Sequence, residues 1–257
     1  MAEIKKENQG IQDDTKRVFL KNSGLTVGGL LVGGALGSLF LGKKGGTQTA
    51  APATAPAHEM SSNPTKAYMY FTKDEEFKTI EAAAEQIFPE TEIGPGAKAL
   101  DVGYYIDHQL AGNWGQNTKE YMVGPFAPAG STIAEEGYQT HLKRHEIFDL
   151  GIAELNKTAQ KNHEKQFFEL DAEQQIAILV DFEEDKVKIN GATTASQFFD
   201  LLRTATIEGV YADPMYGGNK DMGGWKMKNF PGHQMSYLSI IEKDEFVKME
   251  PHSLSSH

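Results

Sequence analysis

The sequence contains no cysteine, which excludes several kinds of cofactor site at once. Without thiolates the chain has no disulfides, no thiolate ligands for zinc or iron–sulfur clusters, and no thioether attachment of haem. It also lacks a Gly-x-Gly-x-x-Gly dinucleotide turn, a phosphate-binding loop and a Gly-x-Ser-x-Gly nucleophile elbow. We therefore predict no catalytic residue, no cofactor-binding residue and no metal ligand in this chain.

Basic residues are fewer than acidic ones. The sequence has 25 Lys and Arg and 36 Asp and Glu, which gives a net charge of -11. Nucleic-acid binding needs a basic face, so we expect no nucleic-acid partner. The charge is distributed unevenly, since residues 1–44 carry seven basic and four acidic side chains. This basic N-terminal segment, residues 1–44, is called the head below. A basic head on an otherwise acidic chain is typical of a segment that a membrane or an export machinery recognises.

The head has the parts of a signal peptide. A basic stretch precedes residues 22–42, which carry no charge and are rich in Gly, Leu, Val and Ala. The order is similar to the twin-arginine export consensus, although a lysine stands where the first arginine belongs. The residues that match the consensus positions are Lys16, Arg17, Phe19, Leu20 and Lys21.

The uncharged stretch is also long enough to remain in the membrane. A helix of about 21 residues spans roughly 31 Å, which is close to one bilayer core. Its seven glycines lower helix propensity, and a glycine-rich buried helix is a further reading. We predict a twin-arginine-like signal peptide or membrane anchor over residues 1–44, an Ala/Pro/Thr-rich linker over 45–66, and a folded domain over 67–250.

Helical periodicity dominates the folded domain, and strand patterns are sparse. We predict an all-α domain of five to seven helices with long loops rich in glycine and aromatic residues. The first helix begins with a capping box at Thr72 and ends before Pro89. Asp171 caps a later helix, and Thr194 or Ser196 caps the last one. The helices are expected over residues 72–88, 97–110, 132–161, 171–182 and 194–207.

The glycine–aromatic segment, residues 209–232, has no helical or strand period. It contains six glycines, two prolines and several aromatic and acidic residues. A loop of this length is uncommon in a compact domain and is usually functional when ordered. We therefore place the candidate site here.

Two kinds of side chain stand out in this segment. The oxygen donors Asp213, Asn219 and Asp221 either hold a cation or cap turns by bonding backbone amides. The aromatic residues either tie the segment to the domain or contact a partner, since interface cores are rich in such side chains. They are Tyr211, Tyr216, Trp225 and Phe230, with Met227 beside them.

Two histidine patterns lie outside this segment. His141 and His145 are four residues apart, so both are expected on one helix face, either as metal ligands or as a surface pair. His108 follows Asp107, which is either an acid–base pair or an adjacency without chemical meaning. A stand-alone metal or acid–base enzyme that uses His141 with His145, or Asp213 with Asp221, is one alternative function. A ligand-binding domain tethered by residues 22–63 is a further alternative.

The glycine–aromatic segment carries a family likeness. It resembles the signature of the gluconate 2-dehydrogenase subunit 3 family, and residues 80–89 and 94–107 resemble the family's opening helices. The likeness covers about residues 70–235. The matching residues of the signature are Ala212-Asp213-Pro214, Tyr216-Gly217-Gly218-Asn219, Asp221, Gly224-Trp225 and Phe230-Pro231-Gly232.

The resemblance implies a small, non-flavin subunit of an exported, membrane-associated dehydrogenase. In such complexes a glucose–methanol–choline-type subunit holds FAD and oxidises a sugar or sugar acid. Where a third subunit is present, it carries haem c and passes electrons to quinone. The small subunit carries the signal for the twin-arginine translocation machinery and is needed to export or assemble the FAD subunit. The implied location is the extracytoplasmic face of the cytoplasmic membrane.

The resemblance transfers no catalytic residue to this chain. It favours instead an interface between the glycine–aromatic segment and the FAD subunit. The candidate interface residues are Tyr211, Asp213, Tyr216, Asn219, Asp221, Trp225 and Phe230.

Overall fold

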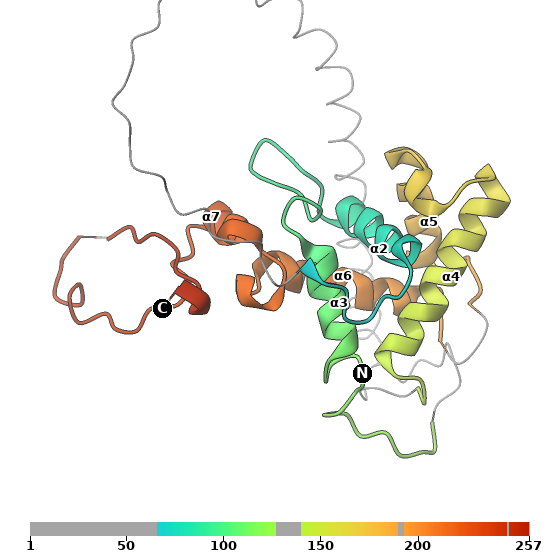
Figure 1. Cartoon of the computed structure of the whole chain (residues 1–257), viewed down its shortest axis with the longest axis horizontal. Helices are drawn as coiled ribbons and strands as arrows, with labels where there is room; N and C mark the ends of the chain where they lie inside the picture. The colour runs from blue at the N-terminus through green and yellow to red at the C-terminus, as the bar shows by residue number, and fades with distance from the viewer. Residues whose placement is uncertain (1–65, 127–139, 190–192, 246, 257) are drawn as a thin grey trace, which may run out of the picture.

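The computed structural model describes residues 66–126, 140–189, 193–245 and 247–256 (Figure 1). Within these ranges the chain forms α-helices and short 3-10 helices without a strand, which confirms the all-α prediction. The predicted export signal lies outside the described residues. So do residues 132–139, the first part of the third expected helix. The α-helices are α2 (Asp74–Ile87), α3 (Val102–Ala111), α4 (Arg144–His163), α5 (Ala172–Glu183), α6 (Ala195–Tyr211) and α7 (Gly223–Lys228).

Helix α6 is the centre of the domain, because α2, α3, α4 and α5 all pack against it. Its inward side chains include Phe198, Phe199 and Leu202, which are fully buried or nearly so. The predicted cap at Thr194 is confirmed, since its side chain accepts a hydrogen bond from the Gln197 amide. Removing these side chains from water supplies most of the stability of the bundle.

Of two predicted helix starts, one is confirmed and the other was wrong. Asp171 caps α5 as expected, with its Oδ1 accepting from the Gln174 amide at 2.9 Å. The predicted capping box at Thr72 was wrong, because α2 begins at Asp74 and no side chain caps it. Three acidic residues in the first turn stabilise this end electrostatically instead, through the helix dipole.

The helix predicted to begin at residue 132 starts only at Arg144. The Arg144 amide donates to Asn117 Oδ1 at 2.9 Å, and the Lys143 amide donates to Glu146 Oε2 at 2.8 Å. These bonds satisfy amides at the start of the helix. The early start was wrong because the side chain of Asn117, which lies far away in sequence, takes part in fixing the boundary.

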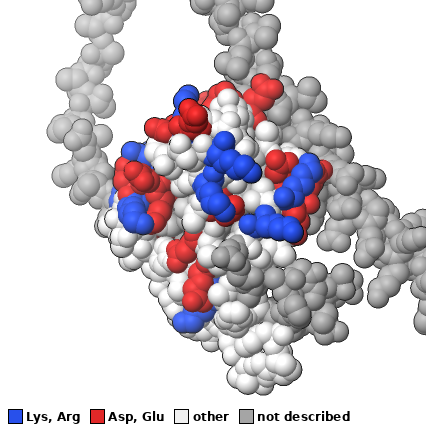
Figure 2. Space-filling model, turned by 90° about the vertical axis from the view of Figure 1, so that its right-hand side faces the viewer, with Lys and Arg blue, Asp and Glu red and all other residues white. Residues whose placement is uncertain are grey.

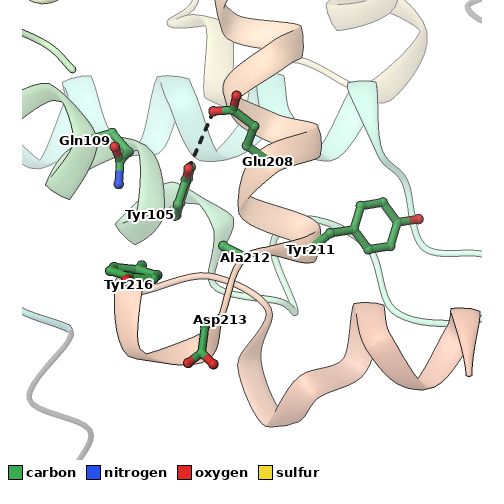
Figure 3. Close-up of a pocket in the computed structure, with 7 residues that line it drawn as sticks. All are labelled: Tyr105, Gln109, Glu208, Tyr211, Ala212, Asp213 and Tyr216. Carbon is green, nitrogen blue, oxygen red and sulfur yellow. Dashed lines mark hydrogen bonds between the residues drawn. The ribbon is translucent and has the colours of Figure 1, made fainter. Parts of the chain in front are cut away.

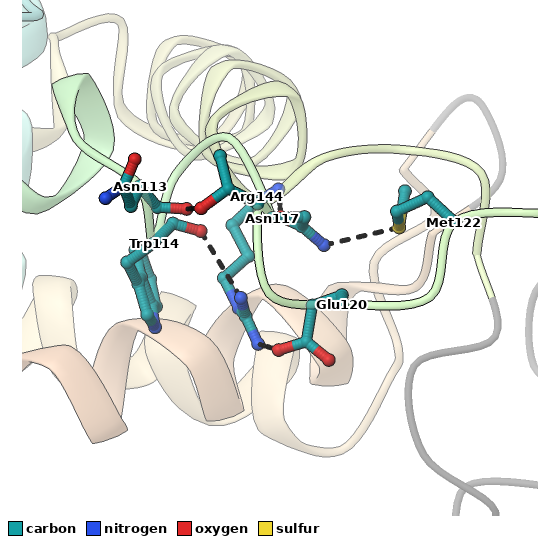
Figure 4. Close-up of polar contacts among 7 residues, drawn as sticks. Asn113, Trp114, Asn117, Glu120, Met122 and Arg144 are labelled. Atoms are coloured by element: carbon teal, nitrogen blue, oxygen red, sulfur yellow. Dashed lines mark hydrogen bonds and ion pairs between the residues drawn. The ribbon is translucent and has the colours of Figure 1, made fainter.

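Arg144 also anchors the connection between α3 and α4 (Figure 4). Its guanidinium lies over the Trp114 ring, 5.1 Å from the centroid, and pairs with Glu120 at 2.7 Å. The same guanidinium donates to the Trp114 carbonyl at 3.3 Å. The planar guanidinium of arginine stacks on an aromatic ring and donates hydrogen bonds in several directions at once. The ammonium group of lysine would not replace it here.

The end of the domain formed by α4 and α5 is covered with charged groups of both signs (Figure 2). Ion pairs here include Lys157 with Glu154 and Lys186 with Asp181. Exposed pairs of this kind contribute little to stability and keep a face solvated. Within the described ranges, no helix combines the length and hydrophobicity that a membrane crossing requires.

Candidate functional site

The glycine–aromatic segment is folded rather than irregular. After α6 ends at Tyr211, two 3-10 turns follow, Pro214–Tyr216 and Lys220–Met222, and α7 continues from the second turn. The prediction that this segment lacks helical structure was therefore wrong. Elements of three to six residues are too short to produce a visible period, and left-handed backbone at Asn219, Asp221 and Met222 separates them.

Asn219 holds the folded segment together. Its side chain is fully buried; its Nδ2 donates to the Ala212 carbonyl at 2.7 Å, and its Oδ1 accepts from the Gly224 amide at 2.8 Å. One amide group thus joins the end of α6 to the start of α7. The close approach requires glycine at 224, because a Cβ there would lie 2.0 Å from the Val210 carbonyl oxygen.

Asp213 joins the segment to the end of the chain. Its carboxylate caps the first 3-10 turn through the Met215 amide at 3.0 Å. It also accepts from the Ser253 hydroxyl at 2.7 Å and from the Leu254 amide at 2.8 Å. Asp221 is exposed. The oxygen donors of this segment were expected either to hold a cation or to cap turns. The bonds observed for Asp213 are those of a turn cap.

The two readings of the aromatic residues apply to different residues. Trp225 is only 6% exposed and donates its indole N–H to the Tyr211 carbonyl at 2.7 Å, so it ties α7 to α6. Phe230 packs edge-on against Trp225, with 5.3 Å between ring centroids, yet it remains 48% exposed. Tyr216 is equally exposed. Trp225 is therefore a structural tether, while Phe230 and Tyr216 remain accessible to a partner.

A pocket of about 430 Å³ opens beside Tyr216. In Figure 3 the Tyr216 ring lies below Tyr105 and Gln109, whereas the Tyr211 ring points away from them. The Gly217 backbone, with φ at 107°, forms the turn after Tyr216. The pocket is lined by Tyr105, Gln109, Glu208, Tyr211, Ala212, Asp213 and Tyr216.

Tyr105 is the most buried side chain of this pocket. Its hydroxyl donates to Glu208 Oε2 over 3.5 Å. Burial raises the pKa of Tyr105 to about 12, and the nearby Glu208 carboxylate adds to the increase. The pocket therefore places a phenolic hydroxyl beside an acidic side chain.

We expect Tyr105→Phe to reduce the loss of stability at alkaline pH. The unfolded chain loses a tyrosine proton near pH 10, whereas folded Tyr105 holds its proton up to about pH 12. The wild-type free energy of unfolding should fall between those two values, and the variant should fall less steeply. Urea titrations at pH 9, 10 and 11 measure the difference; equal slopes for both proteins would contradict it.

The two histidines predicted to share a helix face do not share a helix. His145 lies in α4, but His141 precedes it, and its ring lies 6.1 Å from that of Phe126. The prediction was wrong because α4 begins at Arg144. His145 lies 3.3 Å from the Tyr70 hydroxyl, which donates to Asp149 at 2.7 Å. Among the described residues, no three His, Asp or Glu side chains gather closely enough to hold a metal.

Asp107 has a structural role that the sequence did not reveal. Its buried carboxylate accepts hydrogen bonds from the backbone amides of Met69, Tyr70 and Phe71, at 2.6, 3.0 and 2.8 Å. His108 instead lies 3.2 Å from the Ala67 carbonyl, so the two neighbours do not act as a pair. One signal was available, since Asp107 lies on the inward face of α3.

The comparison with family models finds a match over most of the described domain. Residues 74–232 match the model described as gluconate 2-dehydrogenase subunit 3. Searches of curated proteins and of solved structures gave no significant match. The matched range runs from the first residue of α2 to the glycine that follows α7, and so includes the pocket and the whole folded segment. The chain therefore belongs to the gluconate 2-dehydrogenase subunit 3 family.

Proposed function

We propose that this chain is the accessory subunit of an exported, flavin-dependent dehydrogenase complex similar to gluconate 2-dehydrogenase. In this proposal it assists the export, assembly and stability of a catalytic subunit that holds FAD. A third subunit with haem c completes the complex where one is present. The family match supports the role of a subunit, because its description names subunit 3 of gluconate 2-dehydrogenase.

The observation that carries the proposal is a set of three exposed apolar side chains on the segments before and after α7, which we call the apolar surface around α7. Met215, Tyr216 and Phe230 are 44%, 48% and 48% exposed. The backbone beneath them is held by the bonds of Asn219 and Asp213. Exposed aromatic and Met side chains on an ordered frame are typical of protein interfaces. Helix α7 itself adds the exposed Lys226 and Lys228 to this surface, whereas the α4–α5 end carries charges of both signs (Figure 2).

The pocket beside Tyr216 gives this surface a recess. Its volume lies within the usual range for small-molecule sites, and it is also large enough for one partner side chain. Aromatic walls and a carboxylate together favour a partner side chain with an aliphatic stem and a hydrogen-bond donor at its end, such as lysine or arginine. We assign the recess to the interface with the FAD subunit.

The export role rests on residues 1–44. A basic segment followed by an uncharged, glycine-rich stretch would direct the folded subunit and its partner to the twin-arginine translocation machinery. The mature complex would then lie on the extracytoplasmic face of the cytoplasmic membrane. Replacing Lys16 and Arg17 together with glutamine tests this part: export of both subunits should stop. Continued export of the FAD subunit would contradict it.

Purification of the native complex tests the proposal as a whole. The full chain, tagged at its C-terminus, should be recovered from its own host together with a protein that shows flavin absorbance. The FAD and the dehydrogenase activity should both belong to that second protein. Recovery of the tagged chain without any flavoprotein would reject the proposal.

We expect Tyr216→Ala to weaken the complex without unfolding the subunit. A half-exposed ring contributes little to folding, but truncating an interface aromatic residue costs about tenfold or more in affinity. The measurement is flavoprotein recovered per tagged chain, with the thermal midpoint of the isolated subunit measured in parallel. Tyr121→Ala is the matched control, because Tyr121 is 78% exposed and lies between α3 and α4. Equal losses for both variants would contradict the assignment.

A further inference from the structure

The C-terminal loop, residues 233–252, is described by the structure except at residue 246, and it is held at both of its ends. Gly232 and His252 form a bridge, in which the His233 amide donates to the His252 carbonyl at 2.7 Å. The His252 amide donates to the Pro231 carbonyl at 3.1 Å. Ser253, the next residue, bonds to Asp213. The base of the loop is thus part of the same frame that carries the apolar surface around α7.

Between these ends the loop extends away from the helical body (Figure 1). Three of its large apolar side chains have almost no cover: Met235, Leu238 and Ile241 are 80%, 82% and 71% exposed. The Ile240 and Ile241 amides both donate to the Tyr237 carbonyl, which gives the tip a turn. Single exposed apolar residues are ordinary, but several on one projecting loop indicate a surface that becomes buried.

The charges of the loop identify the kind of surface that covers it. Glu242, Asp244 and Glu245 follow the apolar residues, with Lys243 as the nearest cation. An anionic membrane would repel this acidic run, because lipid headgroups attract basic segments. A second copy of the chain is disfavoured as well, since each copy carries a net charge of -11. A protein groove with an apolar floor and a basic rim fits both features.

We propose that residues 233–252 form a docking loop that inserts into an apolar, basic-rimmed groove on the FAD subunit. This inference rests on the proposed function and goes beyond the family match, which ends at residue 232. The loop is continuous with the apolar surface through the bonds of Asp213 and Pro231. Holding both ends of the loop reduces the entropy lost on binding.

The test uses the full chain and the FAD-containing protein that co-purifies with it, identified by flavin absorbance and mass spectrometry. The double variant Leu238→Asp/Ile241→Asp should bind this flavoprotein about 100-fold more weakly in surface plasmon resonance. Tyr121→Asp, which changes an equally exposed apolar residue outside the loop, should bind as wild type. Helical circular dichroism and the thermal midpoint should match wild type in both variants.

A charge-reversal variant tests the basic rim. Glu242→Lys/Glu245→Lys should bind about tenfold more weakly at low salt, with most of the difference lost at 0.5 M NaCl. Unchanged binding by the Leu238→Asp/Ile241→Asp variant would overturn the docking loop and leave the proposed function intact. A wild-type chain that recovers no flavoprotein would overturn the proposed function itself.

Two further outcomes would also overturn the docking loop. The first is binding of the wild-type chain to vesicles of equal phosphatidylglycerol and phosphatidylcholine that the double variant loses. The second is a wild-type dimer in sedimentation experiments that the double variant does not form. The first outcome would assign the loop to a membrane, and the second would assign it to another copy of this chain.

Discussion

Replacing Asp107 with alanine is expected to lower the free energy of unfolding by about 3–5 kcal/mol. The carboxylate is fully buried and accepts three backbone hydrogen bonds from consecutive residues, 69–71. Its removal leaves those donors without their acceptor and opens a cavity in α3. Bonds to a charged acceptor are worth more than neutral ones, so the loss should exceed that of an ordinary polar truncation.

Urea unfolding followed by helical circular dichroism measures this effect. Asp107→Asn should lie between wild type and Asp107→Ala, because the amide keeps one acceptor oxygen but turns an N–H toward the donors. Asp181→Ala is the control, since Asp181 forms an exposed ion pair with Lys186 and should cost less than about 1 kcal/mol. A loss for Asp107→Ala as small as that of the control would contradict the anchoring role.

The consequence of this anchor reaches beyond stability. The three amides belong to the segment that leads into α2, and the predicted linker ends immediately before that segment. Asp107 therefore fixes the point where the head, with its predicted export signal, joins the folded domain. Loss of the anchor should make residues 66–73 accessible to proteases before the rest of the domain opens.

The helices of the bundle could be predicted because the helical spacing of their apolar residues extends over several turns. Phe77, Ile80, Ala84 and Ile87 fall on one face by spacing alone, and all four are buried. The caps of α5 and α6 were equally readable, because the capping bond is local. The start of α4 was not, because part of its capping comes from Asn117, which lies 27 residues earlier in the sequence.

The candidate site shows the same division between local and distant causes. The unusual composition of residues 209–232 marked this segment as the candidate site, and the family match includes the segment. The roles within it were not predictable, because Trp225 and Phe230 differ in burial rather than in chemistry. The C-terminal loop was missed altogether, since its exposure depends on where the backbone of residues 231–233 and 252 pairs.

The Trp225→Ala variant should show how folding and docking are connected in this subunit. Trp225 is almost fully buried, bonds to the Tyr211 carbonyl and packs against the Phe230 ring. Its truncation should cost about 3–5 kcal/mol in the free energy of unfolding, which is typical of a buried Trp. Because α7 is then no longer held against α6, the backbone that carries the apolar surface and the base of the C-terminal loop should become less ordered.

Recovery of the flavoprotein with Trp225→Ala should therefore fall by at least tenfold, while the turnover number of any complex that does form should change little. Phe230→Ala separates the two causes, because this half-exposed ring should reduce recovery with a stability loss of only about 1 kcal/mol. Trp225→Phe should keep most of the packing and lose the bond to Tyr211, and so lie between wild type and Trp225→Ala. If Trp225→Ala instead lowers turnover while recovery is preserved, the segment acts in catalysis, and the accessory role proposed for this surface is wrong.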